Sequence, residues 1–116
     1  MNEEMLTQAL ERIRLLAEDE LTGLTPYDEL LAPSAAVLMI SAVFWRSRFK
    51  YGSRAYRFAL LEAGHVAQNF LLAATGLGLA ACPVGGFYDR RVDAFLGIDG
   101  LYEASVYLLP VGASGA

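Results

Sequence analysis

The N-terminal segment has the apolar spacing of an amphipathic helix. Apolar side chains recur at helical intervals across residues 4–20, at Met5, Ala9, Leu10, Ile13, Leu16 and Ala17. This spacing predicts a helix with one buried face. The turn-forming residues Gly23, Pro26 and Pro33 come next, so residues 22–33 are expected to form a linker with one short helical turn at 26–31.

The rest of the pattern predicts strands that alternate with helices. The uncharged run 35–45 is rich in branched and aromatic side chains, which favours a strand buried on both faces. The other expected elements are a long helix at 54–75 ended by Gly76-Leu77-Gly78, a strand at 79–84, a helix at 89–96 capped by Asp89 and ended by Gly97, and a strand at 104–111. This order predicts an α+β or α/β fold with one core.

Composition is that of a packed protein. The chain has 116 residues, of which 55% are hydrophobic and 19% charged, enough for one domain or part of one. The single cysteine, Cys82, excludes an internal disulfide, is expected to be buried, and favours a reducing, cytoplasmic location. The acidic N-terminus does not have the pattern of a signal peptide.

No charged residue lies between Glu62 and Asp89, a length that could cross a bilayer. His65, Gln68 and Asn69 and several glycines interrupt it. A buried helix, a turn and a buried strand are therefore expected here, with no membrane segment.

Charge is distributed unevenly along the chain. Residues 1–29 carry eight acids and two bases, whereas residues 30–61 carry no acid and five bases, Arg46, Arg48, Lys50, Arg54 and Arg57. Nucleic-acid binding is not expected, because it needs a broad positive surface. The basic island could bind one small anion or form a solvated rim around a strand end.

Two features of the long predicted helix bear on function. Its small residues Ala59, Ala63, Ala67 and Ala74 are expected to leave a face that a second copy fills. Glu62, His65 and Asn69 share one helix face. This set is a weak group of metal ligands, so we expect no metal site and interpret the three as a buried hydrogen-bond network.

Three blocks in order carry a family resemblance. They are Lys50-Tyr51-Gly52 with the following basic residues, Glu62-Ala63-Gly64-His65-Val66-Ala67-Gln68-Asn69, and Pro83-Val84-Gly85-Gly86-Phe87. Together they resemble the C-terminal half of the nitroreductase superfamily, most of all the SagB-type dehydrogenases that make thiazoles and oxazoles in peptides. The resemblance covers about residues 35–112, which divides the chain into an N-terminal helix and linker (1–34), a nitroreductase-like α+β half-domain (35–112) and a frayed tail (113–116).

The resemblance implies FMN, a homodimer with flavin sites at the subunit interface, and hydride transfer. It places Pro83, Val84, Gly85 and Gly86 beside the isoalloxazine ring, where glycines permit close approach of main-chain amides; a plain glycine turn is the alternative. It also gives Lys50 and Tyr51 a catalytic role in the proton-transfer step of azoline oxidation, where neighbouring cations would favour an ionised phenol. The alternative is that the pair lies on the surface at a strand end and has no role in catalysis.

The chain departs from the family in its first 34 residues, which lack the Arg-x-Ser-x-Arg-like motif that holds the FMN phosphate. A phosphate-binding Arg or Lys is also missing from residues 111–116. We therefore expect an incomplete FMN-dependent oxidoreductase that needs a homodimer or a separate N-terminal half and acts on a peptide substrate. The alternatives are a non-catalytic fragment kept for binding or dimerisation and, less favoured, a small membrane-associated protein.

Overall fold

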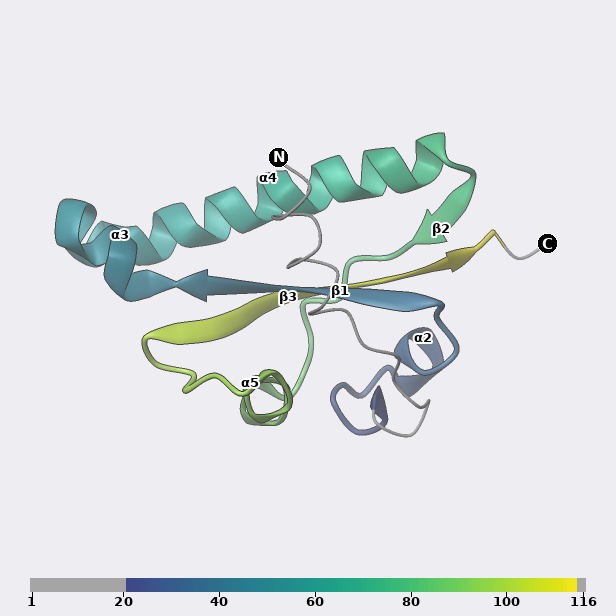
Figure 1. Ribbon diagram of the computed structural model, residues 1–116, viewed down its shortest axis with the longest axis horizontal. Coiled ribbons are helices and arrows are strands. Elements are labelled where there is room, and N and C mark those ends of the chain that lie inside the picture. The colour runs from purple at the N-terminus through teal and green to yellow at the C-terminus, as the bar shows by residue number, and fades with distance from the viewer. Residues whose placement is uncertain (1–20, 115–116) are drawn as a thin grey trace, which may run out of the picture.

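The computed structural model describes residues 21–114, so the helix predicted for residues 4–20 lies outside the described part. A three-stranded antiparallel sheet of order β1-β3-β2 has the long helix α4 on one face and α2 and α5 on the other (Figure 1). The elements are α2 (Asp28–Leu31), β1 (Ala36–Val43), α3 (Phe44–Tyr51), a 3₁₀ turn (Gly52–Arg54), α4 (Ala55–Gly76), β2 (Leu79–Ala81), α5 (Asp89–Leu96) and β3 (Glu103–Ala113). The predicted long helix on a small sheet is confirmed.

The first strand is shorter and more exposed than predicted. It ends at Val43. The main-chain N–H of Phe44 donates to the carbonyl of Tyr102 at 2.9 Å, and helix α3 begins at Phe44. Burial on both faces was a wrong prediction, because no residue of β1 is fully buried and Leu38 is 37% exposed. The reason is that β1 is an outer strand with one neighbour in the sheet.

Helix α4 packs on the sheet through its smallest side chains. Ala55, Ala63, Ala67 and Ala74 are its buried residues, and small contact residues bring a helix close to its neighbour. This face therefore covers the chain's own sheet, and the expectation that it is left for a second copy is wrong. As predicted, a glycine ends the helix: Gly78 has φ +76°.

The hydrophobic core lies on the opposite face, between the sheet, α2 and α5. Its buried members are Leu21, Leu24, Leu31, Val84, Val92 and Leu108, and the partly buried Val37, Met39, Phe87 and Phe95 pack against them. This core fixes the segment before Gly85, because Val84 belongs to it.

The second strand stops at Ala81 instead of Val84. Pro83 has no N–H to donate, so the ladder is interrupted, and the chain rejoins β3 at Val84 through a bridge to Leu108. Cys82 is exposed, which contradicts the predicted burial, because this interruption lies at the outer edge of the sheet.

The last two elements follow the predicted order. Helix α5 has the predicted bounds, and Gly97 ends it with φ +74°; the predicted cap differs, because Tyr88 holds the N-cap position and no side-chain cap is formed. Strand β3 runs to Ala113, beyond the predicted end at 111, because Gly112 and Ala113 pair with β2. None of the helices within residues 21–114 combines the length and apolar character that crossing a membrane requires.

Candidate functional site

A cleft of 610 Å³ lies between the N-terminal part of α4, α3, α5 and the first half of β3. Its apolar lining includes Phe44, Tyr56, Leu60, Phe87 and Val106. The rings of Phe44 and Tyr56 are stacked with centroids 5.6 Å apart, which joins the start of α3 to the start of α4. The cleft therefore has largely apolar walls of the kind that accept a flat organic ring.

Gly85 lies at this cleft directly after an anchored residue. The Val84 N–H donates to the Leu108 carbonyl at 2.7 Å, and the Leu108 N–H returns a bond to the Val84 carbonyl at 3.1 Å. A Cβ placed on Gly85 would meet no atom within 4 Å. The backbone of Gly85 is thus held in place and open toward the cleft.

Gly86 is placed differently, because it contacts the chain itself. Its carbonyl accepts a hydrogen bond from the hydroxyl of Thr25 at 2.6 Å, and a Cβ on Gly86 would lie 3.2 Å from Cε2 of Tyr27. Of the four residues predicted beside a flavin ring, Gly85 lines the cleft, Val84 is in the core, Pro83 is exposed and Gly86 rests on Tyr27.

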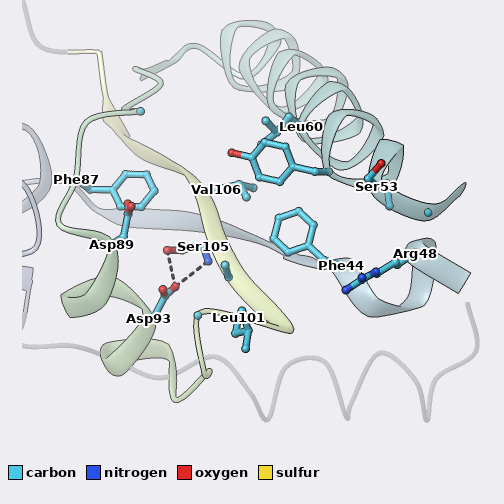
Figure 2. A pocket seen from close by; sticks show the side chains of 16 residues that line it. Phe44, Arg48, Ser53, Leu60, Phe87, Asp89, Asp93, Leu101, Ser105 and Val106 are labelled. Carbon is cyan, nitrogen blue, oxygen red and sulfur yellow. Dashed lines mark hydrogen bonds between the residues drawn. The ribbon is translucent and has the colours of Figure 1, made fainter.

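The floor of the cleft contains a β-bulge. Ile40 is opposite Tyr107 and Ser41 is opposite Ser105, so Val106 has no partner on β1. Beyond the bulge the N–H of Ser105 donates to Oδ1 of Asp93 at 2.8 Å, and its hydroxyl donates to the same oxygen at 2.7 Å (Figure 2). Bulges commonly re-aim side chains beside functional sites, and here Val106 lines the cleft.

Charged groups lie at both ends of the cleft. Arg48 projects from α3 at one end, whereas Asp89 and Asp93 come from α5 at the other (Figure 2). Ser53, in the 3₁₀ turn before α4, also lines the cleft near Arg48. An anionic group would therefore be favoured at the α3 end and disfavoured at the α5 end.

Lys50 and Tyr51 are at the end of α3 rather than at a strand end. Tyr51 lines a separate hollow of 360 Å³ between α3 and α4. Its ring meets Phe58 edge-on at 5.0 Å, and the ammonium of Lys50 lies 5.3 Å from the Tyr51 ring centroid. Among residues 21–114, the structure does not bring the Lys-Tyr pair and the glycine segment into one cavity.

Glu62, His65 and Asn69 do not form the expected buried network. All three are exposed on α4, and within residues 21–114 no hydrogen bond joins them. The physical reason is that the alanines of α4 face the sheet, which turns this polar face outward. Within the same range, no three His, Cys, Asp or Glu side chains gather as a metal site requires.

Sequence reasoning missed most residues of the cleft. Phe44 and Arg48 come from α3, Phe87 from the loop before α5 and Val106 from β3, and no local pattern joins these three segments. Asp93 offered a usable signal, because it is a carboxylate directly after the fully buried Val92 in a short helix. A buried acid in that position needs a hydrogen-bond partner.

The glycine-lined cleft and the long helix over a small antiparallel sheet are features of a known fold. The profile of the nitroreductase family matches residues 3–113, so this chain belongs to the nitroreductase family. It is 39% identical over 103 residues to a nitroreductase-like protein of Methanocaldococcus jannaschii, an alignment that covers 86% of this chain and 50% of that protein. It is 33% identical over 96 residues to the microcin B17-processing protein McbC of Escherichia coli, covering 81% of this chain and 35% of McbC. The chain thus spans half or less of the length of these relatives.

Solved structures share the fold. A nitroreductase-like protein of Anabaena variabilis superposes with a TM-score of 0.73 at 30% identity, over 85% of this chain and 20% of that one. A chain of the E. coli microcin synthetase McbBCD complex with truncated pro-MccB17 bound gives 0.65 at 30% identity, over 69% of this chain and 30% of that one. A nitroreductase-like protein of Exiguobacterium sibiricum in complex with FMN gives 0.70 at 16% identity, over 100% of this chain and 80% of that one.

Proposed function

We propose that this chain forms the flavin-ring side of an FMN-dependent oxidoreductase that works with a second copy or another polypeptide. The observation that carries the proposal is the open backbone of Gly85 at the edge of a 610 Å³ cleft. Membership of the nitroreductase family and a shared fold with a protein in complex with FMN support it.

The residues of the cleft fit a flavin ring. Phe44, Phe87 and Val106 offer apolar surface, and the absence of a side chain at Gly85 lets a flat ring approach the main chain. Arg48 provides the cation that an anionic part of the ligand needs. When bound, FMN would supply a hydride acceptor, a chemistry that no side chain provides.

We further propose that the substrate is a peptide azoline, which the enzyme oxidises to an azole. The support is the Lys50-Tyr51 pair together with the similarity to McbC, which processes microcin B17. Lys50 and Tyr51 would act on the proton that leaves the ring carbon. Since the pair is outside the cleft of Gly85, we propose that a second copy, or a partner protein of a synthetase complex, brings the two parts of the site together.

Flavin binding to the full chain tests the proposal. FMN fluorescence quenching should show saturable binding to the wild-type chain, alone or with its partner. Gly85→Val should weaken binding about tenfold or more, which corresponds to ~1.4 kcal/mol, because its side chain would fill the open space. Gly64→Ala, in a helix position where a Cβ meets nothing within 4 Å, is the matched control and should bind as wild type.

Gly86→Val is expected to abolish flavin binding and to affect the stability of the fold less than it affects binding. The Tyr27 ring must move to admit the new side chain, because a Cβ on Gly86 would lie 3.2 Å from it. If Gly85→Val and Gly86→Val both bind FMN as tightly as wild type, the placement of the ring is wrong. If the wild-type chain binds no FMN with any partner, the non-catalytic alternative is correct.

A further inference from the structure

The hollow that contains Tyr51 is built from matching positions on two helices. Ser47 and Tyr51, one turn apart on α3, face Phe58, Leu61, Glu62 and His65 on α4, which lie three and four positions apart on one side of that helix. A second hollow of 480 Å³ shares Ser47, Glu62 and His65 and reaches residues 40–43 of β1. His65 therefore lies where two adjoining hollows meet.

The imidazole of His65 is free to meet a ligand. His65 is exposed, and its ring makes no hydrogen bond or ion pair with the other residues between 21 and 114. The titratable groups that line the two hollows with it are Tyr51 from α3 and Glu62 from its own helix. The Lys50 ammonium lies beside the Tyr51 ring, and the hydroxyl of Ser41 on β1 donates to the Glu103 carboxylate at 3.0 Å.

We infer that His65 is a catalytic residue, the proton acceptor of the Tyr51 hollow. This inference rests on the proposed function. Imidazole is the side chain that most often serves as a general base, and His65 lines the same hollow as Tyr51 with its ring open to a ligand.

The proton balance is simple. Oxidation of an azoline removes one proton and one hydride from adjacent ring atoms. An imidazole nitrogen of His65 takes the proton, becomes imidazolium and releases the proton to water, while both electrons leave with the hydride, for which the proposed flavin is the acceptor. Tyr51, with the Lys50 ammonium beside its ring, would orient the substrate and assist the same proton transfer. Phe58 and Leu61 supply the apolar wall against the substrate ring.

The chain offers a direct binding test, because His65 is its single histidine. The imidazole nitrogen signals of the ¹⁵N-labelled full chain, or of its complex, are followed during titration with a short thiazole-containing peptide. They should shift saturably, and the same peptide with unmodified cysteine should bind at least about tenfold more weakly, which corresponds to ~1.4 kcal/mol. Tyr51→Phe should weaken the response. Signals that do not move with the thiazole peptide overturn the inference.

Turnover of the reconstituted enzyme gives the second measurement. His65→Gln should lower kcat by about 10²–10⁴ with little change in KM. Gln68→Ala, an exposed position on the same helix outside both hollows, should keep wild-type turnover. Full activity of His65→Gln overturns the inference. A wild-type chain that never binds FMN defeats the proposed function, and the peptide titration still reports on His65.

Discussion

Oδ1 of Asp93 accepts two hydrogen bonds from Ser105, one from the main-chain N–H at 2.8 Å and one from the hydroxyl at 2.7 Å. Both residues are 8% exposed. The carboxylate takes the place of a neighbouring strand at this point of β3, because β2 and Val84 pair only with the later part of the strand. The bulge at Val106, and with it the floor of the cleft, therefore depends on a side chain of α5.

Removing this carboxylate should cost measurable stability. Asp93→Ala leaves the N–H and hydroxyl of Ser105 buried without their partner, and we expect the free energy of unfolding to fall by about 2–3 kcal/mol. Urea unfolding measures the change. Asp89→Ala, on the same helix but exposed, is the control and should cost under ~1 kcal/mol. Equal losses in the two variants would mean that the Asp93–Ser105 contact contributes nothing specific.

Two glycines with positive φ allow the packing around Asp93 to be separated from backbone strain. Gly100 has φ +78° and a Cβ there would lie 2.7 Å from Oδ2 of Asp93, whereas Gly97 has φ +74° and open space around it. Replacement of either by alanine should cost about 1–2 kcal/mol from the backbone conformation. Gly100→Ala should cost more than Gly97→Ala in thermal or urea unfolding, because it also displaces the carboxylate. A smaller loss at Gly100 would contradict this packing.

Asp99 should make stability depend on acid pH. The main-chain N–H groups of Glu103, Leu101 and Tyr102 donate to its carboxylate, and these hydrogen bonds, with Glu103 first, lower the pKa of Asp99 below its ordinary value of 3.8. A lowered folded-state pKa stabilises the fold above 3.8, and this contribution is lost as pH falls through the folded value.

Asp99→Asn tests this directly, because the amide oxygen still accepts hydrogen bonds but carries no charge. The variant should be less stable than wild type near neutral pH, and the difference should shrink as the pH is lowered. Urea midpoints measured across the acid range decide the matter. A constant difference at every pH would show that the charge of Asp99 plays no part.

Tyr51→Phe and Lys50→Ala test the proposed proton chemistry at the end of α3. Each should lower azoline turnover at least about a hundredfold while flavin still binds. Tyr102→Phe, at an exposed tyrosine outside the hollow, should leave the rate unchanged. Unchanged turnover in both test variants would remove Lys50 and Tyr51 from the mechanism.

Self-association is still expected, through a different face from the one that the alanines suggested. Leu61 and Leu72 are 55% and 61% exposed on α4, and about three helical turns separate them, so they lie on one side of the helix. Exposed apolar side chains that share a helix face mark an interaction surface. Sedimentation equilibrium at micromolar concentration should show a dimer that Leu72→Glu weakens. Leu77→Glu, at an exposed leucine beyond the end of α4, makes the same replacement away from this face and should dimerise normally. A monomeric wild-type chain would contradict the prediction.

The sequence predicted the elements whose signals are local. Helix α5 and its end at Gly97 follow from a short apolar pattern and a glycine. Helix α3 was missed because Phe44 and Trp45 have strand propensity, and the tertiary structure decides where β1 ends. Local pattern likewise placed Cys82 inside a strand that Pro83 interrupts.

The residues of the candidate site follow the same rule: a contiguous motif was predicted from the sequence, whereas contacts between distant residues were not. The glycine segment was found because it is a contiguous motif, and Gly85 does line the main cleft. The contact between Asp93 and Ser105 joins residues twelve positions apart, and Arg48 meets the cleft from a helix that was not predicted. Contacts of this kind depend on how the helices are arranged over the sheet. The spacing of apolar residues along the sequence does not predict that arrangement.

The pairing of β1 with β3 also has a consequence for synthesis of the chain. Ala36 is opposite Val111, and Val43 is opposite Glu103, so the partner of the first strand is made long after the strand itself. Until then the eight uncharged residues Ala36–Val43 have no strand beside them. Non-local pairing of this kind closes slowly and leaves an aggregation-prone segment open. For this chain the exposed interval ends only when β3 is made, so slow translation between β1 and β3 should lower the yield of folded protein.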